Sequence, residues 1–531
     1  MRISKWSAGA LLLTSVALPG GGKALPAPAP RMSTAERCAA LAGKQLDQGV
    51  RITSTKHVGA AAPGTVPSGF GPPIPSGIPA HCLVEGTIDP RTGAGGKPYG
   101  IGFALALPDT WNGRFLLQGG GGLNGSVAPP LGAVAAGDTP ALARGFAVIS
   151  HDSGHKGAVF DASFMADQRA ALDFAEASVR TVTLIGKTIT TGFYGKPIAH
   201  SYMTGCSTGG RESMLASQRY PELFDGIVVG APAMRTGDSN LAIAWSAIQF
   251  NQAALRDADG LANVSGIFPA SDRALILKGM LDQCDMLDGL ADGIIQNVAQ
   301  CRFQPARLQC TGAKTDSCLS KAQVSAMDRA FAGPKDAAGY PVYAPVPYDT
   351  GIVYDGAPLP GYLPTGAPGV FGPAPRELSM DLDARVQAIR ADGVQRLTDT
   401  HVWTNLSSFL GRGGKILFYH GVSDPWFSAF ATWDYWERAR TANGPAWDAA
   451  SRFYMVPGMA HCAGGNAFDN FDLLGPVVDW VEKGTAPQGV TASRQTPAKA
   501  SRPMCPHPGY AHYVGGDPAQ AESFQCRMPQ R

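Results

Sequence analysis

The sequence predicts an α/β protein whose central sheet is mostly parallel and whose chain is interrupted by a large insertion. Short apolar runs recur in the first and last parts of the chain, and helical stretches such as residues 167–188 separate several of them. Parallel strands need crossover helices of this kind. The strand-like runs are Ile101–Leu107, Phe115–Gln118, Phe146–Ser150, Ser201–Thr204, Ile227–Val229, Ile416–Tyr419 and Phe453–Val456.

A long stretch of different character divides the strand-forming parts. From residue 235 to residue 402, helical pieces alternate with acidic turns and cysteines, and residues 339–376 are rich in proline and glycine. The chain is also longer than one sheet domain of this kind requires. We therefore expect residues 31–234 and 403–531 to build one domain, and residues 235–402 to form a lid inserted into it.

Ser207 stands at the centre of a motif typical of a nucleophile. Residues 205–209 (Gly-Cys-Ser-Thr-Gly) fit the pattern Gly-x-Ser-x-Gly, in which a tight turn between a strand and a helix exposes the serine oxygen. With 66 glycines in 531 residues the pattern alone is weak, and a glycine-rich surface loop is the alternative. Its flanks favour the turn, because a strand-like run precedes it and residues 211–218 form a helix-like stretch without glycine or proline.

The partners of Ser207 are expected downstream, in the order acid and then histidine. His461 follows the apolar run 453–456, and Asp424 follows the strand-like run 415–419. An aspartate there can accept the Nδ1 hydrogen of the histidine and stabilise the imidazolium that forms when the serine loses its proton. The sequence thus predicts a catalytic triad of Ser207, Asp424 and His461 on an α/β-hydrolase fold. Rival acids, which lie in a helix-like stretch or beyond the histidine, are Asp434, Asp469 and Asp472.

A serine that attacks an ester also needs backbone N–H groups for the oxyanion that develops. The N–H of Thr208, directly after the nucleophile, is one donor by the geometry of the turn. The second is expected from the four glycines 119–122, which follow the strand-like run 115–118. Glycine permits the close backbone approach that such a site requires. We take Gly121 as this donor, although the sequence alone does not distinguish it from its three glycine neighbours.

The first residues have the features of a secretory signal peptide. A basic start, Met1–Lys5, precedes an apolar stretch too short to span a bilayer, Ala8–Leu18, and a small-residue exit. We expect residues 1–24 to be the signal peptide and residues 25–30, which alternate proline with small residues, to be a disordered leader. The protein is therefore expected to be secreted or periplasmic.

The ten cysteines fit the oxidising compartment that a signal peptide implies. Cys206 and Cys462 adjoin the serine and the histidine, so a bond between them would hold both reacting groups in place. A sequence does not determine connectivity, and the other pairs are inferred from proximity alone. The expected disulfides are Cys38–Cys82, Cys206–Cys462, Cys284–Cys301, Cys310–Cys318 and Cys505–Cys526.

The charge of the chain excludes several kinds of partner. The net charge is +2 and the charges are well mixed, so no basic surface for nucleic acid or for an anionic membrane is indicated. No later apolar run is long enough to cross a membrane. We expect a small-molecule substrate, no nucleic acid and no stable membrane association.

Four aspartates fall within eleven residues of the expected lid, in the segment 282–292. Oxygen ligands at short spacing around Asp-Gly turns suit Ca²⁺, although the spacing is not that of an EF-hand loop. A row of solvated aspartates that cap short turns is the alternative. Repulsion between close carboxylates favours calcium, which would be structural because the segment lies outside the triad.

These motifs together resemble those of the tannase and feruloyl esterase family over nearly the whole chain. The segments around Ser207, Asp424 and His461 are similar to the family's nucleophile, acid and histidine motifs, and the adjacent cysteines resemble its active-site disulfide. The resemblance implies a secreted serine hydrolase that cleaves esters of aromatic acids through an acyl-enzyme. It also implies a lid calcium site. Its ligands would be the side chains of Asp285, Asp288 and Asp292 and the carbonyls of Leu290 and Ile294.

The resemblance leaves the substrate open, because the family includes tannases, feruloyl esterases and mono-(hydroxyethyl) terephthalate hydrolases. It implies a slot for an aryl group, and we expect His420 and Phe427, on either side of Asp424, to line it. Ordinary core packing is the alternative for Phe427. The resemblance also implies that a terephthalate monoester needs a lid arginine, and residues 332–375 contain none. Lid tyrosines suited to phenolic hydroxyls are Tyr343, Tyr348 and Tyr354.

A hypothesis from another class is a calcium-dependent binding protein without activity on a hydrolase scaffold. A binding protein would not need a serine, an acid and a histidine in this order, so an ester hydrolase is the leading hypothesis. Because one fold serves many reactions, the fold does not decide the substrate.

Overall fold

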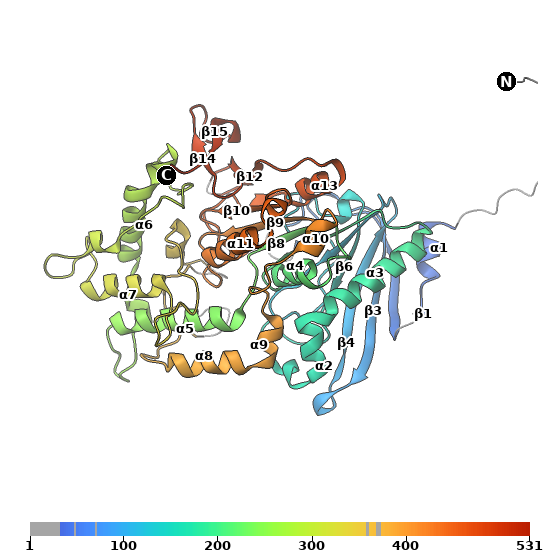
Figure 1. Cartoon of the computed structure of the whole chain (residues 1–531), viewed down its shortest axis with the longest axis horizontal. Coiled ribbons are helices and arrows are strands. Elements are labelled where there is room, and N and C mark those ends of the chain that lie inside the picture. The colour runs from blue at the N-terminus through green and yellow to red at the C-terminus, as the bar shows by residue number, and fades with distance from the viewer. Residues whose placement is uncertain are drawn as a thin grey trace, which may run out of the picture.

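The computed structural model of the chain describes residues 32–46, 49–68, 72–356, 361–367, 373–496 and 498–530. The expected signal peptide and leader, residues 1–30, lie outside the described residues. A large sheet flanked by helices forms one part of the protein, and a mostly helical part lies beside it (Figure 1).

The large sheet is mixed, with antiparallel strands on one side and parallel strands on the other. Its order is β1-β2-β3-β4-β6-β5-β7-β8-β9-β10. The strands from β1 to β4 pair antiparallel, as does β4 with β6, and every pair from β6 to β10 is parallel. The strands are β1 (Gln45–Leu46), β2 (Val50–Val58), β3 (His81–Thr92), β4 (Pro98–Pro108), β5 (Arg114–Gln118), β6 (Ala147–His151), β7 (His200–Cys206), β8 (Gly226–Gly230), β9 (Lys415–Gly421) and β10 (Ser451–Val456).

The strand-like runs of the sequence correspond to β4 to β10, which confirms the predicted α/β-hydrolase fold. Strands β2 and β3 were not predicted. In β2 only Val50 and Ile52 are fully buried, and the other residues are polar except Val58, which is half-buried. A strand with so few buried positions lacks the apolar run by which the parallel strands were recognised.

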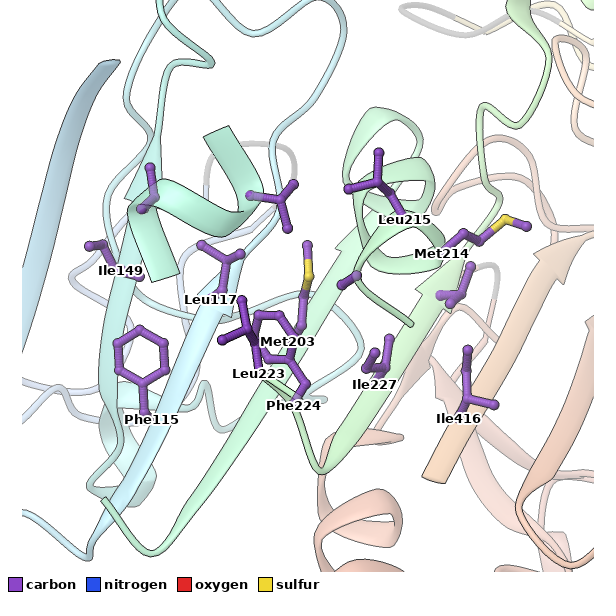
Figure 2. Close-up of a cluster of buried hydrophobic side chains, with 14 of the residues drawn as sticks. Phe115, Leu117, Ile149, Met203, Met214, Leu215, Leu223, Phe224, Ile227 and Ile416 are labelled. Atoms are coloured by element: carbon purple, nitrogen blue, oxygen red, sulfur yellow. The ribbon is translucent and has the colours of Figure 1, made fainter. Parts of the chain in front are cut away.

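The sheet buries a separate hydrophobic cluster on each face. Successive side chains of a strand point to opposite faces, so Phe115 and Leu117 join one cluster and Leu116 joins the other. Helix α4 (Thr208–Arg219) packs against the first cluster, part of which Figure 2 shows, and α13 (Leu474–Lys483) packs against the second. Each large apolar side chain buried in this way contributes about 1.5–3 kcal/mol, so the strands that carry the site are held firmly from both sides.

The helix expected over residues 167–188 begins where a side chain caps it. Asp167 is the N-cap, and its carboxylate accepts a backbone N–H of the first turn. The helix runs through α2 (Gln168–Leu172), a π-helical turn and α3 (Ser178–Tyr194). It ends at Gly195, whose φ of +63° suits glycine at the end of a helix.

The residues between β8 and β9 form a helical body with a hydrophobic cluster of its own. Phe250, Phe268 and Phe331 belong to this cluster, and each is buried. The helices α5 to α8 of this body lie to one side of the large sheet (Figure 1). An inserted body at this point agrees with the architecture that the sequence predicts. Its helices, with one that leads back to the sheet, are α5 (Thr236–Ala253), α6 (Ala270–Cys284), α7 (Lys321–Ala332), α8 (Leu382–Ala391), α9 (Gly393–Thr398) and α10 (Ser407–Gly411).

The end of the chain adds a three-stranded sheet, β11-β12-β13, and the hairpin β14–β15. No helix among the described residues has the length and apolar character needed to cross a membrane. The remaining elements are α1 (Thr34–Ala39), α11 (Ala429–Asn443), α12 (Pro445–Asp448), β11 (Asn470–Phe471), β12 (Val490–Arg494), β13 (Ala500–Met504), β14 (Tyr510–Tyr513) and β15 (Phe524–Arg527).

Candidate active site

Ser207 lies on the turn between β7 and α4, at the carboxyl end of the parallel strands. Its φ of +63° and ψ of −122° form a conformation that residues other than glycine rarely adopt. The glycines around it are required by close packing, because a Cβ on Gly205 would lie 2.3 Å from the carbonyl oxygen of Gly209. The local structure is the strained strand-to-helix turn expected of a nucleophilic serine.

His461 and Asp424 meet from the loops that follow β10 and β9. The Nδ1 atom of His461 lies 2.6 Å from Oδ2 of Asp424, and both side chains are buried. Burial alone would raise the pKa of Asp424, but the neighbouring His461 and His420 outweigh it and hold this pKa well below its usual range. Asp424 is therefore ionised at neutral pH. Within the described part of the chain, Nε2 of His461 has no hydrogen-bond partner.

Further hydrogen bonds fix the carboxylate of Asp424. Its Oδ1 accepts from the backbone N–H groups of Trp426 and Phe427 at 2.8 Å and 3.0 Å. The backbone of its own turn thus orients the carboxylate of Asp424, in addition to the contact with His461. The rival acids contact other groups: Asp434 pairs with Arg438, Asp472 pairs with Arg144, and Asp469 accepts from the N–H of Gly464.

His420 does not line a substrate slot, contrary to the expectation from sequence. Its side chain is fully buried, and its Nδ1 lies 2.9 Å from Oγ1 of Thr432 on helix α11. Its Nε2 lies 2.9 Å from the carbonyl oxygen of Phe427 and 3.2 Å from Oδ2 of Asp424. Since both ring nitrogens face groups of the protein, His420 helps to hold Asp424 in place.

Several backbone N–H groups near the turn at Ser207 have no hydrogen-bond partner among the described residues. Thr208 is the first residue of α4, so its N–H has no partner within the helix. The glycine loop 119–122 runs next to this turn, and its first two N–H groups donate within the protein. Among the described residues, those of Gly121 and Gly122 donate no hydrogen bond, and a Cβ on Gly121 would meet nothing within 4 Å. Because there is open space beside Gly121, its N–H remains the expected second donor.

Glu212 of helix α4 holds the glycine loop in place. The side chain is 1% exposed, and its Oε2 accepts the N–H of Gly120 at 2.8 Å. Its Oε1 lies 3.4 Å from both Nδ2 of Asn124 and Oγ of Ser153. One carboxylate therefore joins several segments around the oxyanion donors. Glu212 was not predicted, because nothing in the sequence distinguishes it from a solvated residue of the same helix.

The disulfide between Cys206 and Cys462 ties the serine turn to the histidine loop. The two residues lie 256 positions apart in the sequence, and their Cα atoms are 6.0 Å apart. Cys462 has a φ of +66°, so both sides of the site contain a residue in a rarely adopted conformation. All the expected pairs are bonded in the structure: Cys38–Cys82, Cys206–Cys462, Cys284–Cys301, Cys310–Cys318 and Cys505–Cys526. Five disulfides are typical of an extracellular-type protein.

Aromatic rings surround the imidazole of His461. The ring centroids of Trp426 and Phe427 lie 4.7 Å and 5.2 Å from that of His461. Phe160, which is 40% exposed, meets Trp426 edge to face at 6.4 Å. Phe427 was expected to line a slot for an aryl group, and Trp426 and Phe160 were not predicted. Trp426 had a local signal, since it stands two positions after the catalytic acid, whereas Phe160 comes from a distant loop.

The lid tyrosines lie in different surroundings. Tyr343 is buried, and its hydroxyl oxygen accepts the N–H of Ser428 at 3.3 Å. Tyr348 stacks on Phe331 at 4.0 Å between ring centroids. Tyr354 is 43% exposed. Tyr343 therefore contacts the residue after Phe427 through its buried hydroxyl.

The aspartate block follows helix α6 in the inserted body. Asp285 and Asp288 are 7% and 2% exposed, and Asp292 pairs with Arg502. Burial raises the pKa of Asp288 to about 7. Oδ1 of Asp285 is buried without a hydrogen-bond partner in the described chain. In the same described residues, no three acidic, histidine or cysteine side chains form a group that could hold a metal ion. The other two expected ligands, Leu290 and Ile294, lie on the same turns.

The order of the sheet defines an α/β-hydrolase fold, and the turn at Ser207 and the pair Asp424–His461 are typical of the serine enzymes of this class. The sequence matches the family "Tannase and feruloyl esterase" over residues 82–354 and 376–527. The chain belongs to this family, and it is a carboxylic ester hydrolase with small ester substrates.

The chain is similar to several curated proteins and solved structures. It is 38% identical over 521 residues to the mono(2-hydroxyethyl) terephthalate hydrolase of Piscinibacter sakaiensis, with 85% of each chain covered. It is 32% identical over 416 residues to the probable feruloyl esterase B-2 of Aspergillus flavus, covering 73% of this chain and 76% of that protein. The crystal structure of feruloyl esterase B from Aspergillus oryzae superposes with a TM-score of 0.75 at 25% identity, covering 93% of this chain and 100% of that one. Tannin acyl hydrolase from Aspergillus niger shares the fold, with a TM-score of 0.67 at 21% identity over 94% and 96% of the two chains.

Proposed function

We propose that the protein is a serine esterase that cleaves esters of aromatic and phenolic acids, as feruloyl esterases and tannases do. The observation that supports the serine chemistry best is the short contact between Asp424 and His461, with Nε2 of the histidine free of other partners in the described chain. The rings of Trp426 and Phe427 beside that imidazole support an aromatic substrate.

The reaction proceeds through two acyl transfers, first to Ser207 and then to water. Oγ of Ser207 attacks the ester carbonyl carbon and gives its proton to Nε2 of His461, while Asp424 stabilises the imidazolium. The negative oxygen of the tetrahedral intermediate accepts hydrogen bonds from the N–H groups of Thr208 and Gly121. The bond to the alcohol then breaks, and the alcohol leaves with the proton from His461. Water repeats the attack on the acyl-enzyme and releases the acid.

Labelling with a fluorophosphonate tests this proposal. The wild-type protein should form a covalent adduct on Ser207, and Ser207→Ala should form none. Ser213→Ala is the matched control, because Ser213 lies on helix α4, which Ser207 directly precedes, is fully buried and has a hydroxyl without a partner in the described chain. Without an adduct on the folded wild-type protein, the alternative of a calcium-dependent binding protein would be favoured instead.

A terephthalate monoester is the second candidate substrate. It is favoured by the 38% identity to the terephthalate monoester hydrolase of Piscinibacter sakaiensis. Against it, three arginines of the inserted body pair with acids of that body, and such arginines are less available for a substrate carboxylate. These pairs are Arg235–Asp238, Arg273–Asp355 and Arg376–Asp257. Values of kcat/KM for methyl ferulate, methyl gallate and a terephthalate monoester would decide between the candidates.

We also propose a structural Ca²⁺ in the inserted body, held by the side chains of Asp285, Asp288 and Asp292 with the carbonyls of Leu290 and Ile294. The buried Oδ1 of Asp285, without a partner in the described chain, supports it. Two observations weigh against it: Asp292 already pairs with Arg502, and no three acidic, histidine or cysteine side chains of the described chain lie together as a metal group.

A chelator should lower the melting temperature if calcium binds the native state alone. Asp288→Ala should do the same and abolish the chelator effect. Asp282→Ala is the matched control, since Asp282 pairs with Lys278 at the surface. An unchanged melting temperature with chelator would exclude the ion, and a change in kcat without a change in melting temperature would place it at the active site.

The proposed location is outside the cytoplasm, either secreted or periplasmic. The five disulfides support an oxidising compartment. Fractionation of a producing cell into medium, periplasm and cytoplasm tests this location, and reduced protein in the cytoplasm would contradict it.

A further inference from the structure

Asp349, from the inserted body, reaches the two loops that carry the acid and the histidine. Its Oδ2 accepts hydrogen bonds from Oγ of Ser423 and from the backbone N–H of Gly458, each at 2.6 Å. Ser423 directly precedes Asp424, and Gly458 lies three positions before His461. One carboxylate oxygen of the insertion thus joins the loops of two triad residues.

The carboxylate of Asp349 is withdrawn from water. Its side chain is 0% exposed, and in the described chain it forms no ion pair with a basic side chain. Its Oδ1 has no hydrogen-bond partner among the same residues. Burial therefore raises the pKa of this carboxyl. Because an apolar side chain of similar size would cost less stability here, the position of the carboxylate points to a role at the two loops.

The inserted body and the two loops are packed too closely to shift independently. The N–H of Gly351 also donates to Oγ of Ser423, at 2.9 Å, and a Cβ on Gly351 would lie 2.6 Å from that oxygen. The N–H of Ser423 donates to the carbonyl oxygen of Met459 at 3.0 Å. A displacement of Asp349 would therefore change the position of the acid loop relative to the histidine loop.

We propose that Asp349 is a positioning residue that sets the geometry between Asp424 and His461 and thereby couples folding of the insertion to catalysis. The proposal rests on the serine-esterase function proposed above, since Asp349 acts through the triad. The contact that it controls is the 2.6 Å distance from Asp424 to His461. About 1 Å of misplacement in an active site can cost on the order of a hundredfold in rate. Because Asp349 acts on the contact used in proton transfer, the effect is expected on kcat more than on KM.

The first test compares Asp349→Asn with a matched control. The variant keeps the volume and can keep both hydrogen bonds only through a neutral amide oxygen, which accepts more weakly than a carboxylate, and it places an NH2 group where the buried Oδ1 has no partner in the described chain. Its kcat should fall about tenfold or more, with KM changed by less than about twofold. Asp272→Asn is the control, because Asp272 is a fully buried carboxylate of the same body that binds Lys314 and Gln323. This control should lower the melting temperature and leave kcat of the folded protein unchanged.

The second test separates positioning from a general structural role. Asp349→Asn is introduced into the Asp424→Ala protein, and the residual hydrolysis is compared. If Asp349 acts through Asp424, the added loss should be less than about twofold. If the added loss equals the loss seen in the wild-type background, Asp349 has a structural role only and the proposal is overturned. Ser423→Ala, which removes one of the two hydrogen bonds, replaces Asp349→Asn where that variant does not fold.

Failure of this inference can be distinguished from failure of the proposed function. Absence of Ser207-dependent hydrolysis in the wild-type protein would overturn the serine-esterase function, and this inference with it. An active wild-type enzyme whose kcat changes by less than about twofold in both Asp349→Asn and Ser423→Ala would overturn the positioning role alone.

Discussion

Nδ1 of His461 lies 2.6 Å from Oδ2 of Asp424 in a buried site, although the two residues come from different loops. Ser207, the proposed nucleophile, stands on a third segment, which the Cys206–Cys462 disulfide ties to the histidine loop. The site is thus assembled from separate parts of the chain. Changes that loosen one part from another should reduce kcat more than they reduce substrate binding.

Removal of two triad residues should cost little more than removal of one. Ser207→Ala and His461→Ala should each lower kcat by several orders of magnitude, because both take part in the same proton transfer. The double variant should retain nearly the activity of either single variant. Steady-state kinetics on an aromatic ester, with circular dichroism to check folding, provides the measurement. Nearly additive losses would contradict a common role for the two residues.

Loss of Glu212 should impair the oxyanion site. Glu212→Ala frees the N–H of Gly120 and with it the glycine loop, so kcat should fall about tenfold or more while KM changes little. Glu482→Ala is a suitable control, because Glu482 binds Arg114 and Tyr202 of strands β5 and β7. Its removal should lower stability and spare kcat. Equal kcat values for the two folded variants would show that Glu212 has no special role at the site.

Asp152 should make stability depend on pH. Burial raises its pKa to about 7, compared with about 4 in an unfolded chain. Between these values the folded protein binds more protons than the unfolded chain. The contribution of Asp152 to stability is therefore fully present below about pH 4 and is lost as the pH rises through about 7.

Asp152→Asn tests this dependence. The hydrogen bonds to Oδ1 from the N–H groups of Gly102 and Gly154 can be kept by the amide oxygen, which does not ionise. Relative to the wild-type protein, the variant should gain free energy of unfolding between about pH 5 and about pH 8. Urea denaturation at several pH values measures the difference. A difference that stays constant with pH would mean that Asp152 titrates at its ordinary pKa.

The strands and the triad motifs could be predicted because each is encoded by residues that are adjacent in the sequence. An apolar run such as Ile227–Val229 forms a strand that is buried on both faces, and a serine flanked by glycines predicts the tight turn on which it lies. Strand β2 could not be recognised, since its burial depends on its neighbours in the sheet. The role of His420 was predicted wrongly, because its chain position beside Asp424 does not reveal that its ring is buried.

Groups that act between distant segments left no local signal in the sequence. Glu212 meets the glycine loop 92 positions away, and Asp349 meets Gly458 109 positions away. A carboxylate on a helix or in a loop is usually solvated, so sequence alone favours that reading. The contacts become visible only when the sheet brings the segments together.

The final prediction concerns the disulfide beside the reacting groups. Replacing Cys206 and Cys462 by alanine should lower kcat about tenfold or more even where circular dichroism shows folded protein, because the serine turn and the histidine loop lose their covalent link. Replacing Cys505 and Cys526 is the matched control, since this bond closes the C-terminal segment with strands β14 and β15. Its loss should lower the melting temperature and spare kcat of the folded fraction. Equal effects of the two replacements on kcat would mean that the link beside Ser207 contributes to stability alone.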